Sequence, residues 1–347
     1  MTTRVTTLVD RIHGSLAAAC IADALGAPTE ERSIPEIERL WGFPVEDFYA
    51  PPSDSPYALG RSAAQFTDDS SQMLMLAQVF IDGEGKATPE AVGRMIVEWA
   101  KLPQYYPHFA GPTTRKAIDR LREGQDPWEV GKAGRIMTEG SSNGGAMRCA
   151  PAGLVNPGNV SAAAHAAFLT CVPSHNTNAG VSGAAAIAAA VAAAAGGEST
   201  VTGIVRAARE GARLGDALGR EHGRTVPAPS IIDRIDIAVD AAMRSDDLAD
   251  AVHRVSRVVG TGLPASEAVP AAIGFFVAAG GDPWTTAVLC ASAGGDSDTV
   301  GCMAGSIAGA FGGIAAVPED RLRAVSEANG LDLRPLAEAL ARVANTD

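Results

Sequence analysis

The chain has 347 residues, of which 46% are hydrophobic, and a formal net charge of −12. This length and hydrophobic content are sufficient for a substantial core, in one large domain or two ordinary ones. The negative charge argues against a nucleic-acid backbone or an anionic membrane as the primary partner.

Apolar and small residues recur every three to four positions along most of the chain, which is the period of an α-helix, whereas two-residue alternation is scarce. The breaks fall at short Pro/Gly/Asp clusters, none of which is long enough for an interdomain linker. We therefore predict an all-α fold in a single domain, residues 1–347. The expected helices lie near residues 5 to 26, 68 to 83, 88 to 101, 160 to 172, 179 to 196, 199 to 214, 230 to 244, 264 to 280, 284 to 293, 299 to 313 and 333 to 344.

Two of these segments carry a small residue at every fourth position. The later stripe is Gly301, Gly305, Gly309 and Gly313, and the earlier one is Gly14, Ala18, Ala22 and Gly26. A glycine inside a helix costs about 1 kcal/mol relative to alanine, so we expect the later stripe to serve close packing against another helix. The earlier stripe is explained equally well by the general Ala/Gly bias of the chain.

The sequence favours a cytoplasmic protein. The apolar stretch from Gly14 to Ala27 is similar to a signal peptide, but Asp23 interrupts it. The Ala-rich segment from Gly180 to Gly196 is short and weakly hydrophobic for a membrane span. The five cysteines stand singly, without Cys-x-x-Cys spacing, which is typical of reduced core residues.

The first acidic motif is Thr67-Asp68-Asp69, which directly precedes an apolar helical pattern. Taken alone, it is what an ordinary helix start looks like, with Thr67 as the N-cap and the two acids favoured by the helix dipole.

A glycine- and serine-rich segment occupies the middle of the chain, at Gly140-Ser141-Ser142-Asn143-Gly144-Gly145. Its backbone N–H groups and hydroxyls could approach a pyrophosphate, although such a cluster is more often a plain turn. Arg148 follows it, and we expect this side chain to brace the loop rather than to contact phosphate.

The second acidic motif, Gly294-Gly295-Asp296-Ser297-Asp298-Thr299, lies more than two hundred residues after the first. Residues two apart point to opposite sides of a helix, so Asp296 and Asp298 can face one ion only from a loop or turn. Gly294 and Gly295 provide that backbone. The two motifs together offer oxygen ligands that suit Mg²⁺ or Mn²⁺ better than zinc. We predict that they meet over one or two such ions, with the ligands Thr67, Asp68, Asp69, Asp296, Asp298 and Thr299.

Several motifs, in order and spacing, make the chain similar to the ADP-ribosylglycohydrolase family. They are Gly14-Ser15-Leu16-Ala17, the run from Asp23 to Glu30, Phe66-Thr67-Asp68-Asp69, the run from Ser142 to Arg148, Ser174-His175, and Gly294 to Thr299. The chain departs from the usual family residues at Ala22, Ser70 and Ser174.

This resemblance implies a single compact orthogonal helical domain of the ADP-ribosylglycohydrolase type that binds two Mg²⁺ or Mn²⁺ ions. It also implies a binding loop for ADP-ribose formed by residues 140–145, with Met147 and with His175 on the adenosine side. Glu30 matches a family glutamate and is expected to act as an acid/base or to position water, with Asp69 sharing that work. Without the resemblance, Glu30 would be read as a solvated surface acid.

The expected reaction is hydrolysis of the glycosidic bond at the anomeric carbon of an ADP-ribosyl group on a protein side chain, with arginine favoured. The alternatives are a hydrolase of a small NAD-derived or nucleoside-like metabolite, such as one in secondary metabolism, and a relative that binds without turnover. From the residues alone, a two-metal phosphohydrolase also fits. We expect leaving-group specificity in variable loops such as Ser33 to Gln65, with its aromatic residues Trp41, Phe43, Phe48, Tyr49 and Tyr57. The oligomeric state is not predicted.

Overall fold

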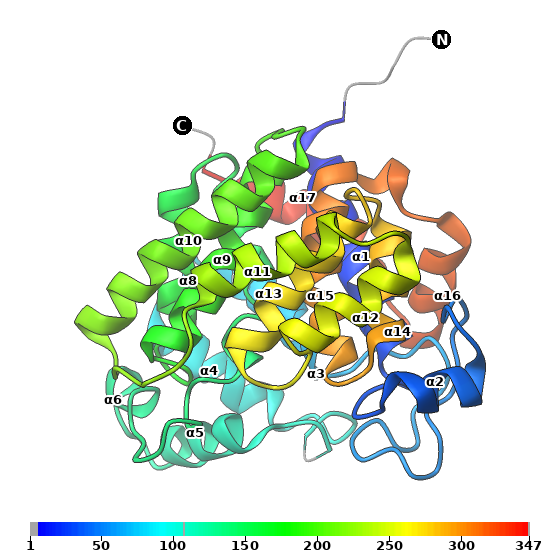
Figure 1. Ribbon diagram of the computed structural model, residues 1–347. Helices are drawn as coiled ribbons and strands as arrows, with labels where there is room; N and C mark the ends of the chain where they lie inside the picture. The colour runs from blue at the N-terminus through cyan, green and yellow to red at the C-terminus, as the bar shows by residue number, and fades with distance from the viewer. Residues whose placement is uncertain (1–5, 107, 346–347) are drawn as a thin grey trace.

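Helices dominate the computed structural model, which describes residues 6–106 and 108–345 (Figure 1). Over these residues no extended strand forms, and the only β-type pairs are two isolated bridges. The all-α prediction is therefore confirmed. The helices are α1 (Leu8–Gly26), α2 (Ile34–Trp41), α3 (Asp68–Asp82), α4 (Pro89–Trp99), α5 (Pro112–Arg122), α6 (Pro127–Val130), α7 (Ala150–Leu154), α8 (Val160–Cys171), α9 (Asn178–Ala195), α10 (Val201–His222), α11 (Ile231–Met243), α12 (Leu248–Val258), α13 (Ala265–Ala278), α14 (Pro283–Ala293), α15 (Ser297–Gly312), α16 (Glu319–Asn329) and α17 (Arg334–Val343), with short 3₁₀ turns at Asn143–Gly145 and Ile314–Ala316.

All eleven predicted helices are present, and most of their ends agree within a few residues. The predicted start of the first helix, residue 5, lies outside the described residues. The predicted end of α10 at residue 214 is wrong, because its apolar face continues and the helix ends at His222. Helices α2, α5, α6, α7, α12 and α16 were not predicted.

Helix α2 lies inside the segment 33–65 that we expected to be a loop. The Ser33 backbone N–H and hydroxyl both donate to the Glu36 carboxylate, at 3.0 Å and 2.6 Å. This capping box and Pro35 in the first turn start the helix. Only Ile37 of α2 is buried, so the apolar pattern in the sequence is too weak to reveal it.

The two stripes of small residues face each other along α1 and α15. A Cβ atom added to Gly305 would lie 2.5 Å from the carbonyl oxygen of Ala18, and one added to Gly301 would lie 2.8 Å from that of Ala22. Close packing of the later stripe is therefore confirmed, and the earlier stripe is its partner. This contact joins the two ends of the chain at the centre of the molecule (Figure 1).

Helices α3, α7, α9, α13, α14, α16 and α17 pack against one or both members of this pair. Helix α9 has the length and composition of a membrane span, but all of its residues except the partly buried Ala193 are buried among the other helices. One main core contains side chains from α1 through α17, and the five cysteines lie buried and unbridged within the fold. The helices thus share one compact core. The domain boundaries at residues 1 and 347 lie outside the described residues and stay a prediction.

Candidate active site

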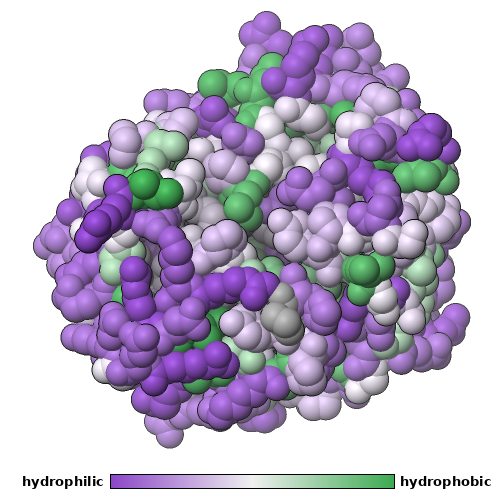
Figure 2. All heavy atoms as spheres, turned by 90° about the horizontal axis from the view of Figure 1, so that it is seen from below, coloured by the Kyte–Doolittle hydropathy of each residue, from purple (hydrophilic) through white to green (hydrophobic). Residues whose placement is uncertain are grey.

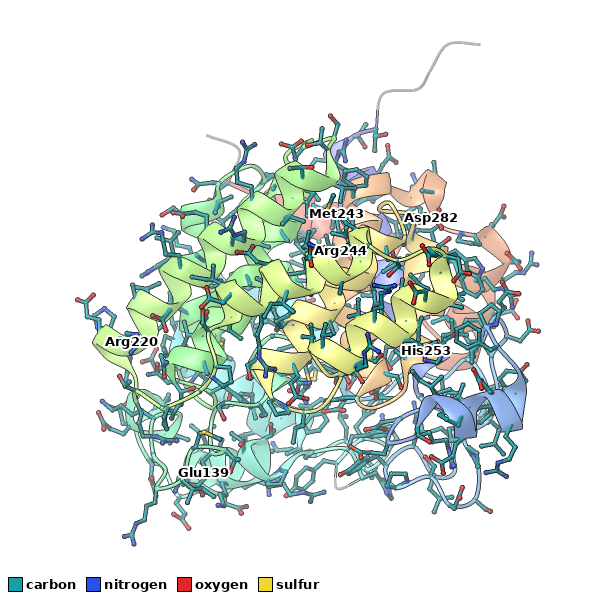
Figure 3. All side chains as sticks on the ribbon, in the orientation of Figure 1. Glu139, Arg220, Met243, Arg244, His253 and Asp282 are labelled. Carbon is teal, nitrogen blue, oxygen red and sulfur yellow. The ribbon has the colours of Figure 1, made fainter. Side chains whose placement is uncertain are left out.

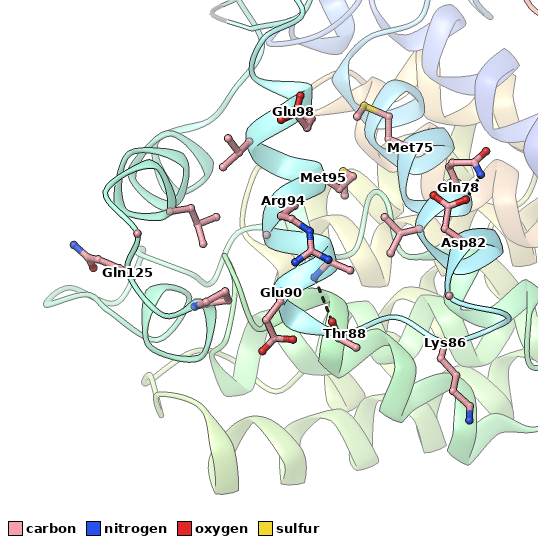
Figure 4. Close-up of a pocket in the computed structure, with 18 residues that line it drawn as sticks. Met75, Gln78, Asp82, Lys86, Thr88, Glu90, Arg94, Met95, Glu98 and Gln125 are labelled. Atoms are coloured by element: carbon pink, nitrogen blue, oxygen red, sulfur yellow. Dashed lines mark hydrogen bonds between the residues drawn. The ribbon is translucent and has the colours of Figure 1, made fainter.

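A cavity of about 360 Å³ brings the two acidic motifs and the glycine-rich loop together. The face of the molecule seen from below is mostly hydrophilic, with separate hydrophobic patches and a hollow near its middle (Figure 2). A larger and more open groove lies between α3, α4 and the α5–α6 region, but no predicted site residue lines it (Figure 4). The smaller cavity is therefore the candidate site. It is lined by Glu30, Glu31, Tyr57, Asp68, Asp69, Phe109, Gly111, Pro112, Thr113, Thr114, Lys116, Ile136, Thr138, Glu139, Ser142, Asn143, Gly144, Met147, Leu263, Asp296, Asp298 and Thr299.

The first acidic motif forms the N-terminus of α3. Thr67 stands at the N-cap, but its hydroxyl donates to Asp69 Oδ2 at 3.0 Å instead of accepting from the helix backbone. Asp23, at the end of α1, takes the capping role because its carboxylate accepts from the backbone N–H groups of Thr67 and Ser70, both at 2.9 Å. This arrangement leaves Asp68 and Asp69 facing the cavity.

The second acidic motif forms the N-terminus of α15. Gly294 and Gly295 have φ of +65° and +66°, which side-chain-bearing residues rarely adopt. A Cβ on Gly294 would also lie 2.0 Å from the Arg32 carbonyl oxygen. The helix begins at Ser297, earlier than predicted, so Asp296 is its N-cap and Asp298 lies in its first turn. Both carboxylates therefore face the cavity although they are only two residues apart, because Asp296 precedes the helix and Asp298 lies within it.

Backbone contacts hold Glu30 beside this motif. The Glu31 N–H donates to the Gly295 carbonyl at 2.7 Å, and the Gly295 N–H donates to the Arg32 carbonyl at 3.1 Å. One carboxylate oxygen each from Glu30, Asp296 and Asp298 can be chosen so that all lie within 4.8 Å of one another. Glu30 is thus close enough to share a cation with the two aspartates. Its predicted work on protons or water stays a prediction.

The carboxylates of Glu30 and of the two acidic motifs are buried and only partly hydrogen-bonded. Glu30 Oε2, Asp69 Oδ1 and Asp298 Oδ1 are buried and have no hydrogen-bond partner among the described residues. Burial, and then the charges of the neighbouring acids, raise the pKa values of Glu30, Asp68, Asp69 and Asp298 well above their ordinary range. Unpaired buried carboxylates are costly unless a cation neutralises them. An all-oxygen donor set of this kind fits Mg²⁺ or Mn²⁺.

The two threonines of the predicted ligand set differ in their surroundings. Thr299 lines the cavity beside Asp298. Thr67 is fully buried, does not line the cavity, and donates its hydroxyl to Asp69. In the described conformation, Thr67 therefore orients a carboxylate.

Only part of the glycine-rich loop lines the cavity. Ser142, Asn143, Gly144 and the following Met147 line it, whereas Gly140, Ser141 and Gly145 do not. Asn143 connects the loop to the acidic cluster, since its side-chain amide donates to Asp296 Oδ2 at 2.6 Å. The loop and the second acidic motif are therefore positioned as one unit.

His175 lies behind the loop rather than in the cavity, because its side chain is fully buried. Its Nε2 shares a hydrogen bond with Ser142 Oγ at 3.0 Å, and its Nδ1 shares one with Ser174 Oγ at 2.9 Å. Burial, and secondarily the charge of Arg148, lower the pKa of His175 to about 3, so the ring is neutral. In this structure His175 supports Ser142, and the predicted contact with adenosine would require it to reach the cavity.

Arg148 connects Ser174 to the acidic cluster through hydrogen bonds. Its guanidinium donates to Ser174 Oγ at 2.6 Å and to Gln72 Oε1 at 3.0 Å, and Gln72 donates in turn to Asp68 Oδ2 at 3.1 Å. Arg148 is fully buried and does not line the cavity. Arg148 therefore supports the loop indirectly, through Ser174 and His175, rather than by hydrogen bonds to the loop itself.

Several lining residues were not predicted, because no motif marks them. Phe109, Thr113 and Lys116 come from α5 and the segment before it, and Ile136 and Leu263 come from loops. Of the five aromatic residues expected to set specificity, only Tyr57 lines the cavity, whereas Trp41, Phe43, Phe48 and Tyr49 pack against the hydrophobic clusters.

Comparisons with known proteins show the family of the chain and support its fold. A family model described as ADP-ribosylglycohydrolase matches residues 4–347. The Escherichia coli protein YegU is 32% identical, with 96% of this chain and 97% of that protein covered. Bovine ADP-ribosylhydrolase ARH3 is 30% identical, with 96% and 93% covered. The ADP-ribosylarginine hydrolase Tri1 of Pseudomonas putida is 22% identical, with 92% and 75% covered. A solved structure described as an ADP-ribosylglycohydrolase-related protein complex has a TM-score of 0.64 at 23% identity, with 97% of both chains covered, and so supports the fold.

Proposed function

Because the chain belongs to the ADP-ribosylglycohydrolase family, we propose that it hydrolyses the glycosidic bond at the anomeric carbon of an ADP-ribosyl group, with Mg²⁺ or Mn²⁺ as cofactor. The observation that carries this proposal is the set of three unpartnered, buried carboxylate oxygens beside a glycine-rich loop in one cavity. The proposed substrate is a protein carrying ADP-ribose on a side chain, in the cytoplasm.

We propose that the acidic cluster holds two divalent ions. We assign Asp68, Asp69, Asp296, Asp298 and Thr299 as the ligands that face the cavity, with Thr67 joining them if its hydroxyl leaves Asp69. When bound, such ions supply positive charge that holds the ribose hydroxyls and makes a nearby water easier to deprotonate.

Glu30 is proposed to accept a proton from the attacking water through its unpartnered Oε2. The water oxygen then forms a bond to the anomeric carbon while the bond from that carbon to the leaving group breaks. The leaving group takes up the proton, and ADP-ribose is released. The loop from Ser142 to Gly144 is proposed to hold the pyrophosphate with its backbone N–H groups.

Arginine is the proposed leaving side chain. Glu31 lines the cavity and is not one of the proposed ligands, so its carboxylate is free to attract a cationic guanidinium. This proposal also agrees with the activity that gives the similar protein Tri1 its name, ADP-ribosylarginine hydrolase.

The test is to incubate the protein with an ADP-ribosylated arginine peptide, an ADP-ribosylated serine peptide and NAD⁺, each with Mg²⁺ or with chelator, and to identify the products by mass. We expect free ADP-ribose from the arginine peptide in Mg²⁺ only. ADP-ribose released from NAD⁺ alone would favour a small-metabolite hydrolase. AMP would indicate cleavage at phosphorus and contradict the proposal.

A further inference from the structure

The charges that line the cavity are almost all negative. Among the described residues, Lys116 is the only lysine or arginine in the lining, which also holds seven carboxylates. ADP-ribose carries two negative charges on its pyrophosphate, and metal ions bound at the acidic cluster would lie at the ribose end of the substrate in the reaction proposed above. A cation beside the loop would therefore be well placed to offset the pyrophosphate charge.

Lys116 lies next to the start of the glycine-rich loop. Thr113 and Lys116 are three residues apart on α5, so their side chains share one face of the helix. The Thr113 hydroxyl accepts from the Gly140 N–H at 3.3 Å. The Lys116 ammonium forms an ion pair with Glu139, the residue directly before Gly140. Glu139 lies at the lower edge of the molecule in Figure 3.

This ion pair can open without leaving a buried charge unpaired. The Lys116 side chain is 53% exposed, and its long flexible stem allows the ammonium to turn. The second oxygen of Glu139 accepts from the Arg135 N–H at 2.7 Å, so the carboxylate keeps a partner when the lysine leaves.

We propose that Lys116 is a substrate-binding residue whose ammonium leaves Glu139 and binds the pyrophosphate of the ADP-ribosyl group, while Glu139 competes for the same ammonium and so sets the affinity. This inference rests on the proposed function, because it takes the pyrophosphate to lie along the loop. In this proposal Lys116 strengthens ADP-ribose binding and Glu139 weakens it.

The test is calorimetry of ADP-ribose and of adenosine in Mg²⁺, with wild type, Lys116→Met and Lys101→Met. Lys101 is a matched control, since its side chain is 60% exposed and pairs with Glu98 away from the cavity. Loss of one charge-assisted hydrogen bond should weaken ADP-ribose binding about tenfold in Lys116→Met. Adenosine binding should not change, and Lys101→Met should match wild type. Unchanged ADP-ribose binding in Lys116→Met, or equal weakening for both ligands, would overturn the inference.

The substitution Glu139→Gln should change ADP-ribose affinity in the opposite direction. It frees the ammonium and removes a negative charge, so we expect ADP-ribose to bind a few-fold tighter. If the ion pair served only to brace the loop, both substitutions would weaken binding, and the inference would be wrong.

These outcomes are separable from those of the proposed function, because calorimetry measures binding and not turnover. A wild-type chain that binds ADP-ribose but hydrolyses none of the substrates would contradict the proposed function and leave the role of Lys116 standing. A wild-type chain that does not bind ADP-ribose would overturn the role of Lys116.

Discussion

Asp68 and Asp298 should be needed for turnover and dispensable for folding. Replacing either by asparagine removes a charge that the cation needs, so we expect turnover in saturating Mg²⁺ to be abolished. In chelator the same change relieves repulsion among buried acids, so the free energy of unfolding should stay equal or rise. Initial rates and urea unfolding would test both effects. Asp240→Asn, at an exposed ion pair on α11, is the control that should leave the rate unchanged.

Glu30→Gln separates proton transfer from metal binding. Glutamine keeps the shape and a hydrogen bond but cannot exchange the proton, so turnover should fall by about 10² or more. The affinities for Mg²⁺ and ADP-ribose should stay within a few-fold of wild type. Calorimetry and a single-turnover assay on one preparation would measure both. Because Glu30 lies within reach of Asp296 and Asp298, lost Mg²⁺ binding would place it among the ligands instead.

The sequence indicated which residues would meet in the cavity where several of them stand close together in one motif. Asp68 and Asp69 are adjacent, and Asp296 and Asp298 lie in one turn, so their shared chemistry is visible in the sequence. Lys116 and Leu263 reach the cavity only because the fold brings α5 and the 259–264 loop beside it. The motif Ser174-His175 was visible too, yet a motif does not say whether a side chain enters a cavity or supports it from behind.

At the level of elements, the contact between α1 and α15 should tolerate no added side chain. A Cβ on Gly305 would lie 2.5 Å from a carbonyl oxygen of α1, so Gly305→Ala must push the helices apart. We expect a cost of about 1–3 kcal/mol in the free energy of unfolding, and more for Gly305→Leu. A normally stable, soluble Gly305→Leu protein would contradict the role of this stripe.

Gly93→Ala is the matched control for this helix contact. Gly93 lies within α4, and the three atoms nearest to an added Cβ belong to side chains, the nearest being Leu121 Cδ2 at 3.3 Å. Because alanine favours a helix over glycine by about 1 kcal/mol, this variant should be as stable as wild type or more stable. Urea unfolding of the two alanine variants would separate close packing from helix propensity.

Most of the helices that were not predicted have few buried residues, whereas α7 is fully buried but too short for a helical period to show in the sequence. In α16 only Val325 is buried, and in α12 only Ala251, Val252 and Val255 are. Their starts depend on caps and prolines rather than on a long apolar stripe. The helices of the central core, such as α9, were predicted because nearly all of their residues are apolar and buried.

At the scale of the whole molecule, the acidic cluster joins distant parts of the chain. Glu30 and Asp69 come from its first quarter, and Asp296 and Asp298 come from its last. The loop carrying Asn143 lies between them in sequence and contacts Asp296. A cation bound there would cross-link segments that meet only in the folded state, so metal binding and folding should be linked.

The last prediction follows from this linkage and from the raised pKa values. In the unfolded chain these carboxyl groups titrate at about pH 4, but burial and mutual repulsion raise the pKa values of Glu30, Asp68, Asp69 and Asp298 in the folded chain. Between the two pKa values the folded protein binds more protons than the unfolded one. The stability of the metal-free protein should therefore fall as the pH rises through that window.

Bound Mg²⁺ should restore the stability that the metal-free protein loses at higher pH, because the ion binds the deprotonated carboxylates. At a hundredfold excess over its Kd, Mg²⁺ should add about 2.7 kcal/mol to the free energy of unfolding. The gain should be larger at about pH 8 than at about pH 5, where protons compete for the same oxygens. Thermal unfolding across this range, with Mg²⁺ or with chelator, would measure it. Asp298→Asn should gain less stability from Mg²⁺ and show a weaker pH dependence of that gain. If Mg²⁺ did not change the unfolding temperature of the wild-type protein at about pH 8, the proposed metal site would be contradicted.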